Sequence, residues 1–153
     1  MNLILEKSDR ISYFTNISEV FIALGISADA FDWYVSNIET NYSVDEFSEG
    51  SRWISGSELA QLLKAHEIQF VWGVFSAVRS GERPPIDIEP YVDGNPSYWS
   101  GKEIRPQLTG ALFEIACWDS SATILVGLSP DLEAAFRRTF PEARPLAQCC
   151  ISS

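Results

Sequence analysis

The 153-residue sequence has few of the residues that bind metals or form cross-links. It contains one histidine, His66, and three cysteines, Cys117, Cys149 and Cys150. A zinc site needs four ligands, usually in two close pairs of Cys or His, so we expect no bound metal. The cysteine number is odd and two cysteines are adjacent, which does not fit a disulfide framework. This pattern favours a reduced, cytoplasmic protein.

Positive charge and long apolar runs are also scarce. Eleven Lys and Arg stand against 21 Asp and Glu, which gives a formal net charge of −10. Binding to DNA or RNA depends on an excess of Lys and Arg, so we expect no nucleic-acid partner. No apolar run approaches the roughly 18 residues of a membrane span. The apolar residues 3–5 are too few for a signal peptide, so we expect a cytoplasmic protein with no membrane partner.

Motifs for nucleotide binding and catalysis are absent too. Neither GxxxxGK[S/T], GxGxxG nor GxSxG occurs in the sequence. Cys117 and His66 would be the candidate Cys–His pair. However, Cys117 stands in an apolar segment typical of a buried strand, and His66 ends a predicted helix, where capping is the commoner role. We therefore predict no catalytic residue and no cofactor.

The length and composition predict one folded domain. Hydrophobic residues make up 46% of the chain, aromatic residues 12% and charged residues 21%. We expect a single α+β domain over residues 1–141, followed by a flexible tail over residues 142–153. Its architecture is predicted to be one mostly antiparallel sheet with about three helices packed on it.

Capping residues mark the three predicted helices. Ser18 and Gly25 would start and stop the first helix, and Ser55 with Glu58 forms a capping box for the second. Ser129, followed by a proline, would cap the third. The predicted strands cover residues 11–15, 32–38, 52–54, 68–78, 86–92, 110–118 and 122–128. The segment 86–92 is expected at an edge because it contains a proline, and residues 119–121 are expected to close a hairpin.

Negative charge is concentrated in the first third of the chain. Residues 1–51 contain nine acidic and two basic residues, and no Lys or Arg occurs from residue 11 to residue 51. A surface of one sign steers association with an oppositely charged partner, so a basic protein is one explanation. Simple solubility is the other, and the sequence leaves both open.

Two acidic loops that contain aromatic residues are the candidate partner-binding segments. Charge-pairing residues together with aromatic anchors are typical of protein interfaces. The candidate residues are Asp45, Glu46, Glu49 and Tyr42 in the first loop, and Asp87, Glu89, Asp93, Tyr98 and Trp99 in the second. For Trp99 the alternative is that its ring folds back over the sheet.

A carboxylate pair offers a different function. Asp87 and Glu89 lie two residues apart, and paired carboxylates hydrolyse glycosides when a cleft separates them suitably. A small hydrolase using a carboxylate of the loop over residues 81–101 is therefore one alternative, and an acidic adaptor or regulatory domain is another. A solvated acidic surface explains the same residues without catalysis.

The order of aromatic segments resembles a group of small acidic bacterial domains. The segments are FDWYV (31–35), ISG (54–56), FVWGVF (70–75) and LFEI (112–115). These domains resemble immunity proteins encoded beside polymorphic or contact-dependent toxins. The resemblance implies a non-enzymatic antitoxin that binds a cognate toxin domain and occludes its active site. It also implies that the toxin is basic if it attacks nucleic acids.

Overall fold

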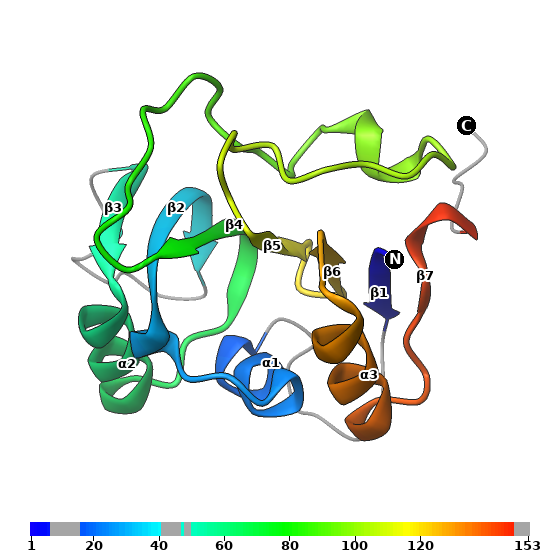
Figure 1. The fold of residues 1–153 in the computed structure, drawn as a ribbon, viewed down its shortest axis with the longest axis horizontal. Helices are drawn as coiled ribbons and strands as arrows, with labels where there is room; N and C mark the ends of the chain where they lie inside the picture. The colour runs from blue at the N-terminus through cyan, green and yellow to red at the C-terminus, as the bar shows by residue number, and fades with distance from the viewer. Residues whose placement is uncertain (7–15, 41–46, 48–49, 149–153) are drawn as a thin grey trace.

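The described residues of the computed structural model form a seven-stranded antiparallel sheet with three α-helices on one face (Figure 1). The structure describes residues 1–6, 16–40, 47 and 50–148. The strands are β1 (Leu3–Glu6), β2 (Phe31–Thr40), β3 (Arg52–Ser55), β4 (Phe70–Arg79), β5 (Phe113–Trp118), β6 (Ala122–Val126) and β7 (Arg144–Pro145). The helices are α1 (Ile17–Leu24), α2 (Gly56–Ala65) and α3 (Pro130–Thr139). The strand order is β3-β2-β4-β5-β6-β1-β7, and the α+β prediction is confirmed.

Local capping explains where the helices begin and end. The Ser55 hydroxyl accepts a hydrogen bond from the Glu58 N–H, and the Ser129 hydroxyl accepts one from the Leu132 N–H, as predicted. The first helix differs, because Asn16 and not Ser18 is its N-cap. Gly25 ends that helix in the left-handed region, with φ of 72°.

One strand prediction is wrong, and another lies outside the described residues. The first observed strand is β1, whereas residues 11–15 lie outside the described residues. Residues 86–92 form no strand, so the predicted edge strand is wrong. The N–H groups of Tyr91 and Val92 bond to side-chain oxygens of Gln107 and Asn37 and not to a neighbouring strand.

The predicted tail is partly structured. β7 pairs with β1, and the Leu146 N–H donates to the Asn2 carbonyl at 2.9 Å. The Leu146 side chain is buried. The prediction of a flexible tail is therefore wrong for residues 144–148, because they close the edge of the sheet. Residues 149–153, which include Cys149 and Cys150, lie outside the described residues.

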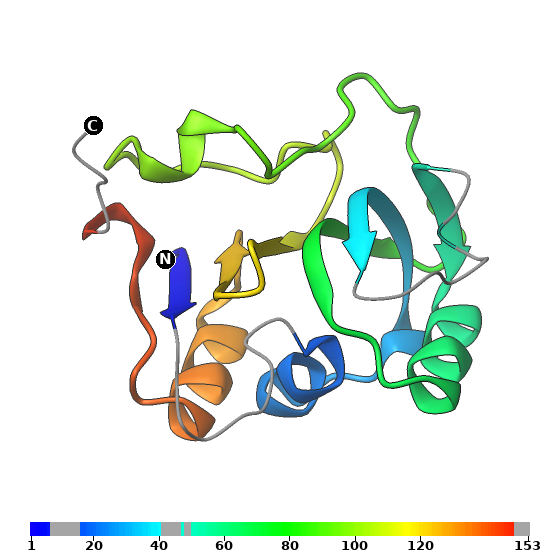
Figure 2. The same ribbon diagram turned by 180° about the vertical axis from the view of Figure 1, so that it is seen from behind.

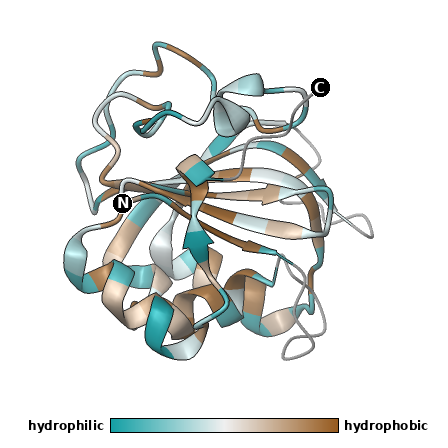
Figure 3. Ribbon diagram, turned by 90° about the vertical axis from the view of Figure 1, so that its right-hand side faces the viewer, coloured by the Kyte–Doolittle hydropathy of each residue, from teal (hydrophilic) through white to brown (hydrophobic). Residues whose placement is uncertain are grey.

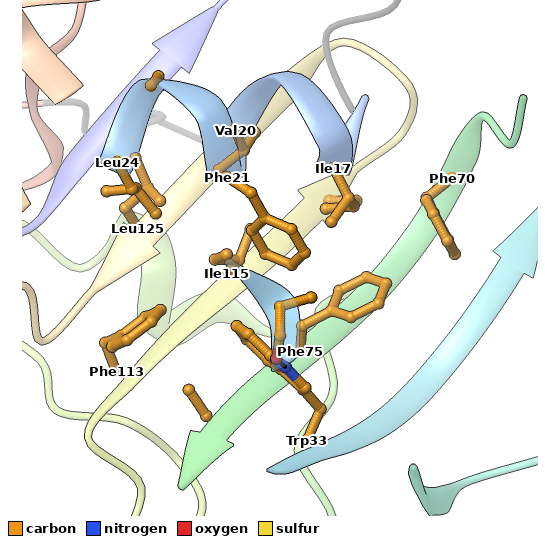
Figure 4. Packing of buried hydrophobic residues seen from close by; sticks show 14 of the residues in the cluster. Ile17, Val20, Phe21, Leu24, Trp33, Phe70, Phe75, Phe113, Ile115 and Leu125 are labelled. Atoms are coloured by element: carbon orange, nitrogen blue, oxygen red, sulfur yellow. Dashed lines mark hydrogen bonds between the residues drawn. The ribbon is translucent and has the colours of Figure 1, made fainter. Parts of the chain in front are cut away.

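Alternating side chains give the sheet two buried faces. Toward the helices, Trp33, Phe75 and Ile115 pack beneath Phe21 of α1 (Figure 4). The opposite face carries a second apolar cluster, which includes Ile124 and is covered by residues 80–112. Figures 2 and 3 show this layering from two further directions. We call residues 80–112 the long loop; it joins β4 to β5 and contains the short 3-10 helix η3 (Pro96–Trp99).

Candidate functional site

A buried carboxylate holds the returning part of the long loop on the sheet. Glu114 of β5 is 1% exposed. Its carboxylate accepts hydrogen bonds from the Gln107 N–H at 2.7 Å, the Leu108 N–H at 3.0 Å and the Ser76 hydroxyl at 2.7 Å. Burial raises the pKa of Glu114, although these three donors oppose the shift. The loop backbone is thereby fixed to two neighbouring strands.

A bulge in β2 holds the outgoing part of the loop. The pairing of β2 with β4 shifts register between Ser36 and Glu39, so that two residues of β2 oppose one of β4. Asn37 at this bulge has φ of 53°, a conformation that asparagine tolerates better than most residues. Its side-chain oxygen accepts from the N–H groups of Val92 and Asp93, at 2.9 and 3.0 Å. The bulge therefore aims one amide at the loop backbone.

Side chains inside the loop join its two legs. Gln107 accepts from the Tyr91 N–H at 3.1 Å and donates to the Tyr91 carbonyl at 2.9 Å, which imitates one rung of a sheet. Asn95 also donates to the Tyr91 carbonyl, and the Thr109 hydroxyl donates to Asp87. A segment without regular structure is thus held by hydrogen bonds along its length, which makes it preorganised.

The first part of this loop exposes apolar and acidic side chains in alternation along the sequence. Ile86 is 37% exposed, Ile88 59% and Tyr91 43%. The acidic side chains between and beside them are also exposed. We call this set the outer loop surface: Ile86, Asp87, Ile88, Glu89, Tyr91 and Asp93. Single exposed apolar side chains are common, whereas several of them close together mark interaction sites. Loops held by a rigid scaffold often carry binding residues.

Near its start, the long loop contributes Arg83 to an ion pair with Asp32 of β2. The Arg83 guanidinium donates to Asp32 at 2.9 Å and lies over the Trp53 ring, 5.5 Å from its centroid. Partial burial opposes ionisation of Asp32, but hydrogen bonds from Arg83 and the Gly81 N–H hold its pKa below the usual value. The charge of Arg83 is therefore paired with a carboxylate of the sheet.

A groove of about 460 Å³ runs between the β2 bulge and the outer loop surface. We call it the bulge groove. The Tyr34 hydroxyl donates to the Glu89 carboxylate at 3.0 Å and fixes this charge at the groove. The lining residues are Asn37, Ile38, Gly50, Ser51, Glu89, Pro90 and Tyr91.

A smaller cavity of about 190 Å³ lies beside Glu114 and is also lined by Asn95, Tyr98 and Gln107. The polar side chains of these four residues make hydrogen bonds within the loop or to its backbone. The described residues of the cavity lining include neither histidine nor cysteine. These hydrogen bonds hold the loop together and attach it to the sheet, and this structural role explains why the four polar side chains lie together.

The structure places the predicted partner-binding residues of the long loop in different environments, some exposed and some buried. Asp87, Glu89 and Asp93 are exposed residues of the long loop. Tyr98 is 2% exposed, so its assignment as a partner anchor is wrong: the loop folds back and buries the ring against the sheet. Trp99 is half-buried and packs on Trp118 with ring centroids 5.1 Å apart, which is the alternative considered for it.

The candidates in the first acidic loop lie outside the described residues; they are Tyr42, Asp45, Glu46 and Glu49. Sequence reasoning missed the exposed Ile86 and Ile88, although the run Ile-Asp-Ile-Glu next to prolines was the available signal.

The candidate nucleophile is enclosed in the core. Cys117 has no exposed surface and belongs to the apolar cluster under the helices. Burial raises the pKa of its thiol, so the reactive thiolate is disfavoured. His66 stands at the C-cap of α2, and its backbone N–H donates to the Leu62 carbonyl.

No family model, curated protein or solved structure matches this chain. Within the described ranges, no three His, Cys, Asp or Glu side chains come together as a metal site. In the same part of the chain, the helices are too short or too polar to cross a membrane.

Proposed function

We propose that this protein is a non-catalytic binding domain that recognises a basic protein through the outer loop surface. The observation that carries the proposal is the alternation of exposed Ile86, Ile88 and Tyr91 with three exposed carboxylates on an anchored loop. Apolar side chains at the centre of an interface supply affinity, while carboxylates around them steer a cationic partner. The net charge of −10 acts in the same direction.

Anchoring of the loop supports binding because it lowers the entropic cost. Ordering a side chain or loop on association costs about 0.5–1.5 kcal/mol per immobilised side chain. Glu114, Asn37 and Gln107 already fix the loop backbone in the free protein. More of the contact energy is then available as affinity.

The specific form proposed is an immunity protein. In this form the basic partner is a toxin domain, and the outer loop surface covers its active site or substrate groove. The proposal rests on the resemblance described above together with the acidic character of the loop. An acidic adaptor would use the same surface, and the identity of the partner separates the two.

Hydrolysis by a loop carboxylate receives less support. A general acid needs a carboxyl whose pKa is raised, usually by burial. Asp87 is exposed, and the hydrogen bond from Thr109 lowers its pKa. Glu89 and Asp93 are exposed as well. The geometry of the loop therefore favours contact with a partner.

Affinity capture from the native cells tests the proposed function. We expect the tagged protein to retain one stoichiometric basic partner, and the double variant Ile88→Ser/Tyr91→Ser to lose it. Ile22→Ser is the matched control, because Ile22 is 69% exposed on α1, on the opposite face of the sheet. Capture of a toxin domain whose activity the protein inhibits would support the immunity form. Equal capture by the double variant and the control would contradict the proposal.

A further inference from the structure

We infer that the bulge groove receives an arginine side chain of the partner. This inference rests on the proposed function and names the group that the partner presents. Among the described residues that line the groove, Glu89 is the one that carries a charge, and this charge is negative. A cationic side chain therefore meets an opposite charge, with no Lys or Arg among these described lining residues.

The Glu89 carboxylate is oriented by one hydrogen bond and can accept further bonds from a planar cation. The Tyr34 hydroxyl supplies one hydrogen bond to Glu89, at 3.0 Å. A carboxylate accepts several hydrogen bonds, and guanidinium binds it in a fork that lysine cannot make. Tyr34 is paired with Trp53 of β3 on one side and with Ser76 of β4 on the other, so this contact ties the loop carboxylate to a strand that is fixed on both sides.

The walls of the groove suit the rest of an arginine. The Tyr91 ring is 43% exposed, and the backbone of this residue is fixed by Gln107 through both its N–H and its C=O. Guanidinium stacks on aromatic faces, while the apolar stem of arginine packs on aliphatic groups. Ile38 and Pro90 supply such groups in the lining. The volume of about 460 Å³ is within the usual range of ligand sites, about 300–1,000 Å³.

The charge of Glu89 adds to the selection. It is negative and lies in the groove lining, while the charge of Arg83, in the first part of the loop, is paired with Asp32 at 2.9 Å. A negative charge in the lining favours arginine over a neutral side chain of the same shape.

Titration with a small probe tests the groove without the partner. The probe is N-acetyl-arginine amide, added to the full chain and followed by amide NMR shifts. We expect saturable shifts at Asn37, Gly50, Ser51 and Tyr91, with a dissociation constant on the order of millimolar. The neutral citrulline analogue and the lysine analogue are each expected to bind about fivefold more weakly.

Variants make the test specific. Glu89→Gln is expected to lose the arginine preference, whereas Glu103→Gln, an exposed residue of the same loop outside the lining, is expected to keep it. The spectra report at the same time that both variants are folded. Absence of shifts at the groove, or equal binding of the three probes, would overturn the inference. If capture still depends on Ile88 and Tyr91 in that case, the proposed function stands and the arginine assignment alone fails.

Discussion

Replacement of Gly56 by alanine is expected to cost about 3 kcal/mol or more of unfolding free energy. Gly56 begins α2 against the 3-10 turn η1 (Ala28–Ala30). An added Cβ would overlap the carbonyl oxygens of Ala28 and Phe31 and lie 2.6 Å from the Cα of Asp29. These are backbone atoms, so no side-chain rotation relieves the overlap. The helix or the turn must move from its place on the sheet.

Urea denaturation of Gly56→Ala and Ser57→Ala measures this effect. Ser57 is exposed in the same helical turn, and its replacement is expected to change stability by about 0.5 kcal/mol or less. Similar midpoints for the two variants would show that α2 does not pack on the turn as closely as the structure indicates.

Replacement of Glu114 by alanine is the second large effect. The Gln107 N–H, the Leu108 N–H and the Ser76 hydroxyl would each lose an acceptor in a buried environment. An unsatisfied buried donor costs about 1–3 kcal/mol, so a total loss of about 3 kcal/mol or more is expected. Amide hydrogen exchange should become faster at Gln107 and Leu108. Glu103→Ala, at an exposed position of the same loop, is the control; equal stability of the two variants would contradict the anchoring role.

The contribution of Glu114 to the unfolding free energy is expected to fall as the pH rises. Burial raises its pKa in the folded protein above the unfolded value, which is about 4.3. The folded state then binds more protons than the unfolded state, so this group contributes most below the unfolded pKa and its contribution is lost as the pH rises through the folded pKa. The stability difference between the native protein and Glu114→Gln should therefore be largest below the unfolded pKa and narrow as the pH rises through the folded pKa. A difference that widens with pH would show that the folded pKa is not raised.

The helices were predictable because their signals are local. Ser55 and Glu58 are three residues apart, and so are Ser129 and Leu132, so the cap can be read from a short window. The same holds for Gly25, whose left-handed conformation ends α1. The aromatic, β-branched and continuous apolar runs of the sheet strands were also local signals, which is why the α+β class followed from the sequence.

The long loop was not predictable because its partners are distant in sequence. The run Ile86-Asp87-Ile88-Glu89 has the period of a strand, but its neighbourhood is fixed by Asn37, 55 residues before Val92. A bulge that turns one asparagine toward a loop leaves no pattern in a single sequence. The prediction that Tyr98 is an exposed anchor failed for the same reason, since loop composition does not indicate which aromatic ring folds back on the sheet.

Association kinetics with the captured partner test the central claim most directly. The outer loop surface should steer a basic protein, so the association rate constant is expected to fall as salt is added. Asp87→Lys/Glu89→Lys should slow association about tenfold at low salt and flatten the salt dependence. The control, Asp131→Lys/Glu133→Lys, places the same charge changes on α3 and should have a clearly smaller effect. Equal rates and equal salt slopes for the two double variants would contradict binding through this loop.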